Sequence, residues 1–149
     1  MIALIQRVTE ASVSVAGERV GAIGPGFLAL VGVRPDDDEQ TAKRLLERLL
    51  AYRVFADAEG RMNRSLSDTG GGLLLVPQFT LAADTRKGNR PGFSTAAEPP
   101  QAARLFEHLC VLARAGHPQV ATGRFGAHMQ VALVNDGPVT FWLQTPENV

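Results

Sequence analysis

The segment Gln78-Phe79-Thr80-Leu81 is the first place where the residue types could do chemistry. It follows an apolar run, predicted to be a buried strand, and it opens a long loop. Strand ends that lead into loops free backbone N–H groups to point at a ligand. Thr80 adds a hydroxyl, but no base accompanies it in the sequence. The segment therefore indicates either a backbone-lined binding site or simply a threonine that ends a strand.

The second such segment is Asn135-Asp136-Gly137-Pro138, which interrupts two alternating apolar stretches. Taken alone, it is typical of a hairpin turn. A Gly-Pro peptide bond can also adopt the cis form, which would hold the two flanking carbonyls in a parallel arrangement.

The region between these segments adds charge but no obvious acid–base pair. Residues 82–97 show no periodicity and carry Arg86, Lys87 and Arg90, and loops of this length are usually functional or disordered. The acidic run 36–39 precedes a helix and is interpreted as its cap and first turn rather than as a metal site. The three histidines are predicted to be a surface residue, a loop residue and a residue before a strand: His108, His117 and His128. An enzyme of this sequence would therefore rely on backbone groups and binding geometry.

Composition limits the possible classes of protein. The chain has 149 residues, 15 basic and 15 acidic side chains, and one cysteine, so we expect a single domain over 1–149. Cys110 alone excludes an internal disulfide and is interpreted as a small buried hydrophobe. A net charge of zero gives no general basic footprint for nucleic acid. The apolar runs are too short for an export signal or a membrane span, and we expect a cytoplasmic protein.

The elements that must position these segments follow from periodicity. Strands are predicted near 2–5, 11–15, 19–23, 27–33, 52–55, 73–76, 129–134 and 139–143, with 11–33 forming a three-stranded meander. One amphipathic helix carries the stripe Ala42 to Leu50, and another begins at Pro99-Pro100 with Gly116 at C′. The fold class is α+β: a curved, mostly antiparallel β-sheet or barrel with two amphipathic helices.

Four strings in this order resemble the D-aminoacyl-tRNA deacylases: MIALIQRV, PQFTLAADTRKGNRPGF, TGRFGAHMQV and NDGPVTFWLQ. The resemblance runs from Met1 to about Gln144. It implies the fold of that family, hydrolysis of the ester that joins a D-amino acid to the 3′ end of tRNA, and a homodimer with active sites at the subunit interface. It also implies that no metal or cofactor takes part.

The resemblance further implies roles for individual positions. Gln78, Phe79 and Thr80 would line the pocket for the terminal adenosine and the ester, with backbone N–H groups holding the ester carbonyl. Gly137-Pro138 would enter the partner's active site and reject L-amino acids, and Arg7 would hold that motif in place. Arg86, Lys87 and Arg90 would contact the tRNA.

An activated ester needs placement and oxyanion stabilisation more than an acid–base pair. We therefore favour activation of water by the neighbouring ribose hydroxyl over a covalent Thr80, and we expect achiral glycyl-tRNA to be cleaved as well. Two positions depart from the family pattern. Pro77 and Gly92 stand where serine is usual, which puts a role for the Pro77 position in doubt and predicts a looser loop at Gly92.

Two alternatives remain open. One is a tRNA-binding module without hydrolysis, although aromatic residues make up only 6% and would supply few stacking surfaces. The other is an esterase that uses Thr80 as its nucleophile.

Overall fold

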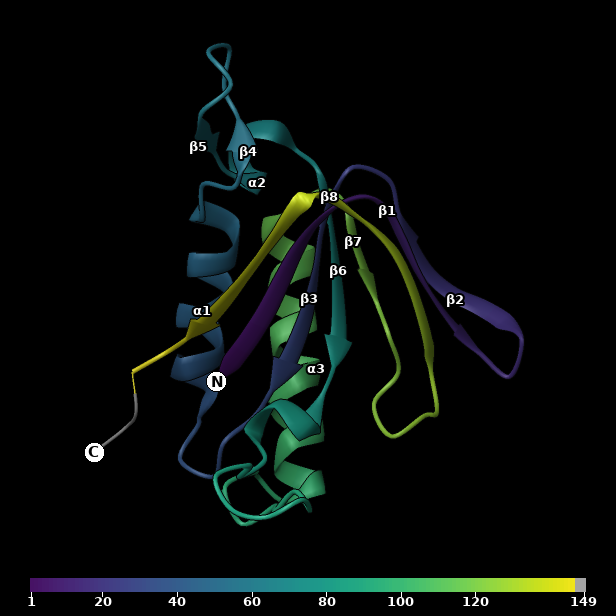
Figure 1. Ribbon diagram of the computed structural model, residues 1–149, viewed down its shortest axis with the longest axis vertical. Helices are drawn as coiled ribbons and strands as arrows, with labels where there is room; N and C mark the ends of the chain where they lie inside the picture. Colours follow the sequence, from purple (N-terminus) through teal and green to yellow (C-terminus); the bar gives the residue numbers. More distant parts are fainter. Residues whose placement is uncertain (147–149) are drawn as a thin grey trace.

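The computed structural model describes residues 1–146 and shows a strongly curved sheet with two long helices packed against one face (Figure 1). The strands of this sheet are β1 (Ile2–Val15), β2 (Glu18–Ile23), β3 (Gly26–Gly32), β6 (Gly72–Pro77), β7 (Val120–Thr122) and β8 (Gln130–Gln144). The two helices are α1 (Glu39–Ala51) and α3 (Pro99–Gly116). The smaller elements are β4 (Phe55–Ala56), β5 (Met62–Arg64), the short helix α2 (Leu66–Thr69) and the 3₁₀ helix η1 (Phe79–Ala82). The predicted α+β class is confirmed.

The long strand β1 organises the sheet. It pairs antiparallel with β2, β3 and β8, while β3–β6 and β6–β7 are parallel, in the order β2-β1-β3-β6-β7. The predicted meander is wrong, because β1 lies between β2 and β3. The two strands expected at 2–5 and 11–15 are one continuous strand whose first half pairs with β3 and whose second half pairs with β2.

Apolar side chains are buried on both faces of the sheet. The main core lies between the sheet and the two long helices, with Phe27, Leu45, Leu73, Leu75 and Leu105 fully buried. A second cluster lies on the other face: Val8, Ala11, Val13, Leu28, Leu74 and Val76. This two-sided burial explains the nearly continuous apolar sequences of β3 and β6. No helix within residues 1–146 has the length and hydropathy needed to cross a bilayer.

The helix ends refine the predictions made from sequence. Asp38 caps α1 by accepting a hydrogen bond from the Thr41 amide at 2.8 Å, which confirms the capping role of the acidic run. Gly116 is the last helical residue rather than C′. His117 follows as the C-cap and is buried, with Nε2 2.6 Å from the Gly71 carbonyl oxygen. Cys110 is buried as predicted, and desolvation raises the pKa of its thiol to about 12.

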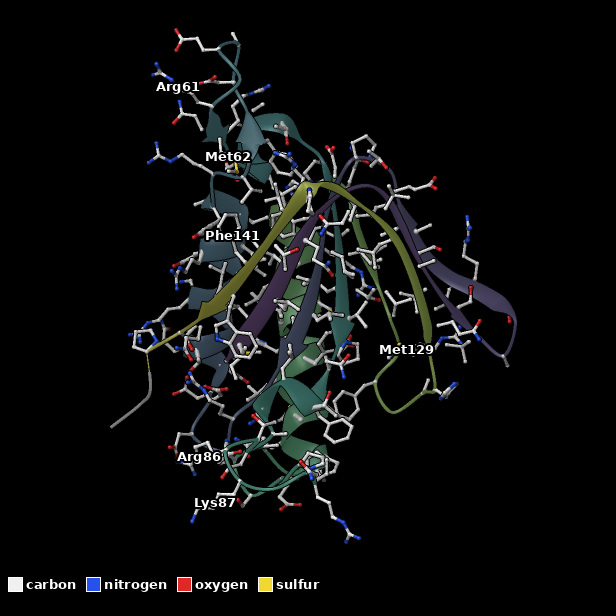
Figure 2. All side chains as sticks on the ribbon, viewed as in Figure 1. Arg61, Met62, Arg86, Lys87, Met129 and Phe141 are labelled. Atoms are coloured by element: carbon white, nitrogen blue, oxygen red, sulfur yellow. The ribbon has the colours of Figure 1, made fainter. Side chains whose placement is uncertain are left out.

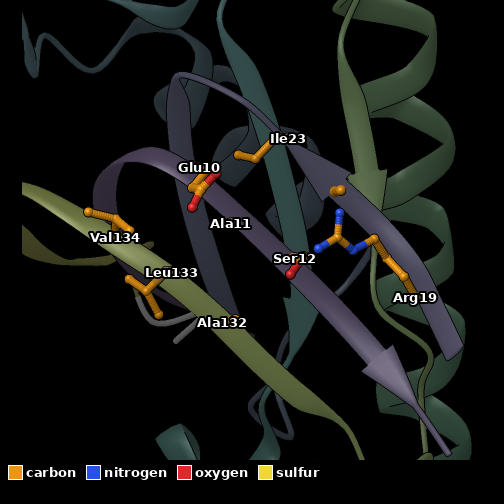
Figure 3. A pocket seen from close by; sticks show the side chains of 9 residues that line it. Glu10, Ala11, Ser12, Arg19, Ile23, Ala132, Leu133 and Val134 are labelled. Atoms are coloured by element: carbon orange, nitrogen blue, oxygen red, sulfur yellow. The ribbon is translucent and has the colours of Figure 1, made fainter. Parts of the chain in front are cut away.

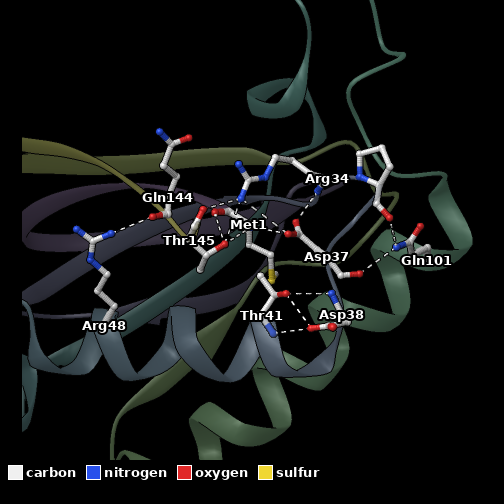
Figure 4. A network of polar contacts seen from close by, with 10 residues as sticks. Met1, Arg34, Asp37, Asp38, Thr41, Arg48, Gln101, Gln144 and Thr145 are labelled. Atoms are coloured by element: carbon white, nitrogen blue, oxygen red, sulfur yellow. Dashed lines mark hydrogen bonds and ion pairs between the residues drawn. The ribbon is translucent and has the colours of Figure 1, made fainter. Parts of the chain in front are cut away.

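A polar network links Met1 and residues 144–145 to α1 and to the segment just before it (Figure 4). The Met1 ammonium is fully buried and donates to Asp37 Oδ1 at 2.7 Å and to Thr145 Oγ1 at 2.6 Å. Arg34 donates to the Thr145 carbonyl at 2.7 Å. Burial lowers the pKa of the Met1 ammonium even though Asp37 opposes this shift. The network fixes the first residues of β1 beside the last residues of β8.

Two further predictions need correction. The strand expected at 52–55 begins only at Phe55, and it pairs with β5 in a small separate hairpin. Residues 135–138 do not form a turn between two strands, because both flanking segments pair with β1. Thr140 lies opposite Gln6 and Asn135 opposite Val8, so residues 136–139 bulge out of β8.

Candidate functional site

The two chemically suggestive segments lie at opposite ends of the sheet (Figure 1). Arg7, next to the bulge of β8, pairs with Phe27 at the start of β3. Pro77, just before Gln78, pairs with Val31 at the end of β3. At about 3.3 Å per strand residue, the β3 segment between these rows spans roughly 13 Å. The fold therefore does not bring the two segments together within one chain.

At the Gln78 end, the chain leaves β6 and turns at once into η1. The Gln78 amide donates to the Val31 carbonyl at 2.7 Å, which fixes the last position of the ladder. Phe79 and Thr80 are the first two residues of η1. The first N–H groups of such a helix have no carbonyl three residues earlier within it, so they can bind an external acceptor.

A cavity of about 590 Å³ adjoins this turn and is lined with aromatic side chains. Phe79, Phe93 and Phe125 are 54%, 46% and 37% exposed, and the Phe79 and Phe93 ring centroids lie 5.3 Å apart. Gln78 and Met129 also line this cavity. The expectation of few stacking surfaces is wrong, because three of the seven phenylalanines gather at one cavity. Such a cavity suits a flat apolar ring system.

Thr80 faces a different space from Phe79. It lines a cleft of about 630 Å³ together with Arg34, Arg86 and Trp142. The Gln78 side-chain amide donates a hydrogen bond to the Thr80 hydroxyl oxygen. Among residues 1–146, no carboxylate or histidine is hydrogen-bonded to this hydroxyl. An amide donor does not remove a proton, so the geometry offers Thr80 no activating base.

The basic loop is closed at its base by Asp84. The Asp84 backbone exchanges two hydrogen bonds with Gly92, at 2.7 and 2.9 Å, and the Asp84 carboxylate accepts hydrogen bonds from the Arg86 guanidinium at 2.8 Å. The hydrogen bond from Arg86 lowers the pKa of Asp84 to about 2. Lys87 and Arg90 are exposed in the segment between Asp84 and Gly92 (Arg86 and Lys87 are labelled in Figure 2).

The two positions that depart from the family pattern fit this geometry. A Cβ on Gly92 would lie 3.8 Å from Asp84, so a side chain is sterically allowed, and the Gly92 backbone is hydrogen-bonded to Asp84. The looser loop expected at Gly92 stays a prediction. The backbone groups of Leu73 and Leu75 form hydrogen bonds on the side of β7. Backbone groups two residues apart in a strand point to the same side, so the N–H that proline lacks at position 77 would also have pointed toward β7. β7 pairs only with Leu73 to Leu75, so Pro77 lies beyond its partner strand and costs no ladder hydrogen bond.

At the Gly137 end, the bulge is fixed by side chains on both sides. Arg7 donates from Nε to the Asp136 carbonyl at 3.0 Å and from Nη1 to the Val54 carbonyl at 2.8 Å. Asn135 Oδ1 accepts from the Val139 amide at 3.1 Å. The Gly137-Pro138 peptide bond is cis, and both residues are exposed. The bulge is thus a fixed, exposed backbone feature.

A smaller cavity lies elsewhere on the sheet, among β1, β2 and β8 (Figure 3). Its volume is about 230 Å³, and its polar lining residues are Glu10, Ser12 and Arg19. None of the residues singled out in the sequence lines it, so it is not part of the candidate site.

Sequence reasoning missed Phe93, Phe125 and Met129 as cavity residues and Val54 as a partner of Arg7. The first three lie within the strings that carry the family resemblance, which was the available signal. Their spacing along the chain does not reveal that they meet, because the sheet brings them together.

Comparison with known proteins gives the family. Residues 4–144 match the family model described as D-Tyr-tRNA(Tyr) deacylase. D-aminoacyl-tRNA deacylases of Azotobacter vinelandii and Thioalkalivibrio sulfidiphilus are 71% and 69% identical, over 97% and 98% of this chain and 99% and 98% of their own lengths. The solved structure of the c-Myc DNA Unwinding Element Binding Protein superimposes with a TM-score of 0.93 at 38% identity, covering 98% of this chain and 99% of that one. The chain therefore belongs to the D-aminoacyl-tRNA deacylase family.

Proposed function

We propose that this protein hydrolyses the ester bond of D-aminoacyl-tRNA, releasing free tRNA and the D-amino acid. The observation that carries this proposal is the aromatic cavity directly beside the first residues of η1. The cavity would take the terminal adenine between Phe79, Phe93 and Phe125. The ester, attached to the adenosine ribose, would then lie next to the Phe79 and Thr80 backbone.

The chemistry we propose uses placement rather than a side-chain base. The Phe79 and Thr80 N–H groups would donate to the ester carbonyl oxygen as it gains negative charge, a contribution of about 10²–10³ in rate for each good donor. Thr80 has an amide donor beside it, not a base, which argues against a covalent threonine intermediate. The neighbouring ribose hydroxyl of the substrate would orient or activate the attacking water.

We infer that the active form is a homodimer in which each chain completes the other's site. Gly137-Pro138 and Gln78 lie at opposite ends of the sheet, so one chain cannot place both on one substrate. A two-fold arrangement would bring one chain's bulge to the other chain's η1. The cleft lined by Thr80 and Trp142 gives the partner's bulge room. Trp142 is 50% exposed in the single chain, as expected for a large apolar side chain that a partner subunit covers.

Such a dimer would explain chiral selection. The Gly137 and Pro138 carbonyls, presented by a fixed bulge, would accept hydrogen bonds from the substrate ammonium and leave no room for an L side chain. A D side chain would point outwards, so its identity would matter little. Exclusion by backbone clash cannot reject a substrate without a side chain, so glycyl-tRNA would also be cleaved.

The tRNA backbone would meet the basic loop. Lys87 and Arg90 are exposed and can bind phosphate, whereas Arg86 is already paired with Asp84 and would contribute less. Enzymes that act on charged tRNA work beside translation, so we place this protein in the cytoplasm.

The direct test is release of tyrosine from tRNA charged with D- or L-tyrosine, with metals chelated. We expect hydrolysis of the D-ester and of glycyl-tRNA, and survival of the L-ester. Equal rates for both enantiomers would contradict the proposed selection, and no release at all would favour a tRNA-binding module.

A further inference from the structure

We propose that Met129 is an oxidation site through which peroxides weaken substrate binding by this protein. The inference rests on the proposed function, because it assigns a consequence to the cavity that would hold the adenine. Met129 is half-buried, and it lines that cavity where the chain enters β8 (Figure 2).

The Met129 sulfur joins the cavity wall to the loop that carries Phe125. Sδ accepts a hydrogen bond from the Arg124 amide at 3.4 Å. It also lies close over Gly123, where a Cβ would be only 2.8 Å from the sulfur. The sulfur is therefore packed against backbone on one side while its residue forms part of the cavity on the other.

The chemistry is a two-electron oxygen transfer. A sulfur lone pair attacks one oxygen of hydrogen peroxide, the O–O bond breaks, and the products are methionine sulfoxide and water. The added oxygen makes an apolar wall polar. Because the sulfur already lies close to Gly123, the added oxygen would enter the cavity or displace the 123–128 loop, and either change would weaken the packing of a flat ring against this wall.

The other sulfur atoms supply internal controls. Met1 is fully buried, and Met62 is 51% exposed on the β4–β5 hairpin, away from the cavity (Figure 2). Cys110 is buried as the neutral thiol, which is not the reactive form. Peroxide should therefore reach Met62 and Met129, and only Met129 touches the site.

The test treats the whole protein with hydrogen peroxide and maps each methionine by mass spectrometry. We expect Met129 oxidation to raise KM for D-tyrosyl-tRNA about tenfold with little change in kcat. After peroxide treatment, Met62→Leu should lose the same fraction of its activity as the wild type does. After the same treatment, Met129→Leu should keep most of the activity that this variant has before treatment. Methionine sulfoxide reductase should restore the activity of the oxidised wild-type protein.

Amide hydrogen exchange at Arg124 gives a readout that does not need activity, and we expect it to change when Met129 is oxidised. The inference is overturned by equal inactivation of Met129→Leu, by full Met129 oxidation with unchanged KM, or by oxidation confined to Met62. If the untreated protein releases no D-tyrosine, the proposed function fails and the effect on substrate binding fails with it, and the exchange at Arg124 then shows only whether oxidation of Met129 disturbs the 123–128 loop.

Discussion

The two ends of the sheet differ in what they offer to a ligand. The Gln78 end is concave, with an aromatic cavity on one side of η1 and the cleft lined by Thr80 and Trp142 on the other. The Gly137 end is a projecting bulge whose backbone is held by Arg7 and Asn135. A receptive surface and a fixed projection on one chain are what a self-complementary dimer requires, since each can serve the other copy. The proposed function assigns nucleotide binding to the Gln78 end and selection of the amino acid to the Gly137 end.

The largest expected effect comes from altering the projection. In Gly137→Ala, the added Cβ would meet Val139 Cγ2 at 2.7 Å and Arg7 Nη2 at 3.2 Å, at a φ of +135° that disfavours side chains. Misplacement of the bulge should lower kcat for D-tyrosyl-tRNA about a hundredfold. Gly17→Ala is the matched control, because Gly17 also has a positive φ but nothing within 4 Å of a Cβ. Wild-type turnover by a folded Gly137→Ala protein would remove the bulge from the mechanism.

The receptive end should respond in binding rather than in turnover. Phe79→Ala removes one exposed ring of the aromatic cavity and should raise KM about tenfold, as loss of a base-stacking surface does. Val111→Ala, which truncates an equally exposed side chain on α3, serves as the control. Steady-state kinetics separate the two parameters, and a drop in kcat alone would show that Phe79 is not a binding residue.

Arg7 tests how rigid the projection must be. Arg7→Lys keeps the charge but cannot reach both the Asp136 and the Val54 carbonyls, so kcat should fall about fivefold. The ratio of D- to L-ester hydrolysis should fall as well, since a looser bulge excludes L side chains less well. A variant with reduced stability but an unchanged ratio would assign Arg7 to folding only.

The smallest effect is expected at Thr80. Thr80→Val preserves the shape and removes only the hydroxyl that binds the Gln78 amide, so activity should fall by about fivefold at most. Thr80→Ala gives the same comparison with a smaller side chain. A covalent nucleophile would instead lose about 10⁴-fold or more in single-turnover assays.

The sequence predicted local structure better than it predicted contacts between residues far apart in the chain. The apolar stripe of α1, the Asp38 cap and the continuous apolar strands β3 and β6 follow from periodicity and burial. The parallel pairing of β3 with β6 could not be read locally, because it depends on the crossover between them.

For the site, the motif at Gln78 and the bulge at Gly137 were visible as sequence. Two properties were not: the gathering of Phe79, Phe93 and Phe125, and the separation of the two motifs along the sheet. Both depend on which strands pair and in which register. The 6% aromatic content misled for the same reason, since composition does not say where the rings meet.

Subunit complementation tests the central claim most directly, that one site is built from opposite ends of two chains. Gly137→Ala and Phe79→Ala chains would be co-expressed with different tags and purified through both. The tags belong at the C-terminus, because the Met1 ammonium is buried. The mixed dimer has one site with an intact cavity and an intact bulge, so we predict about half of wild-type activity at low substrate, far above either variant alone. Activity equal to the mean of the two variants would contradict the shared site.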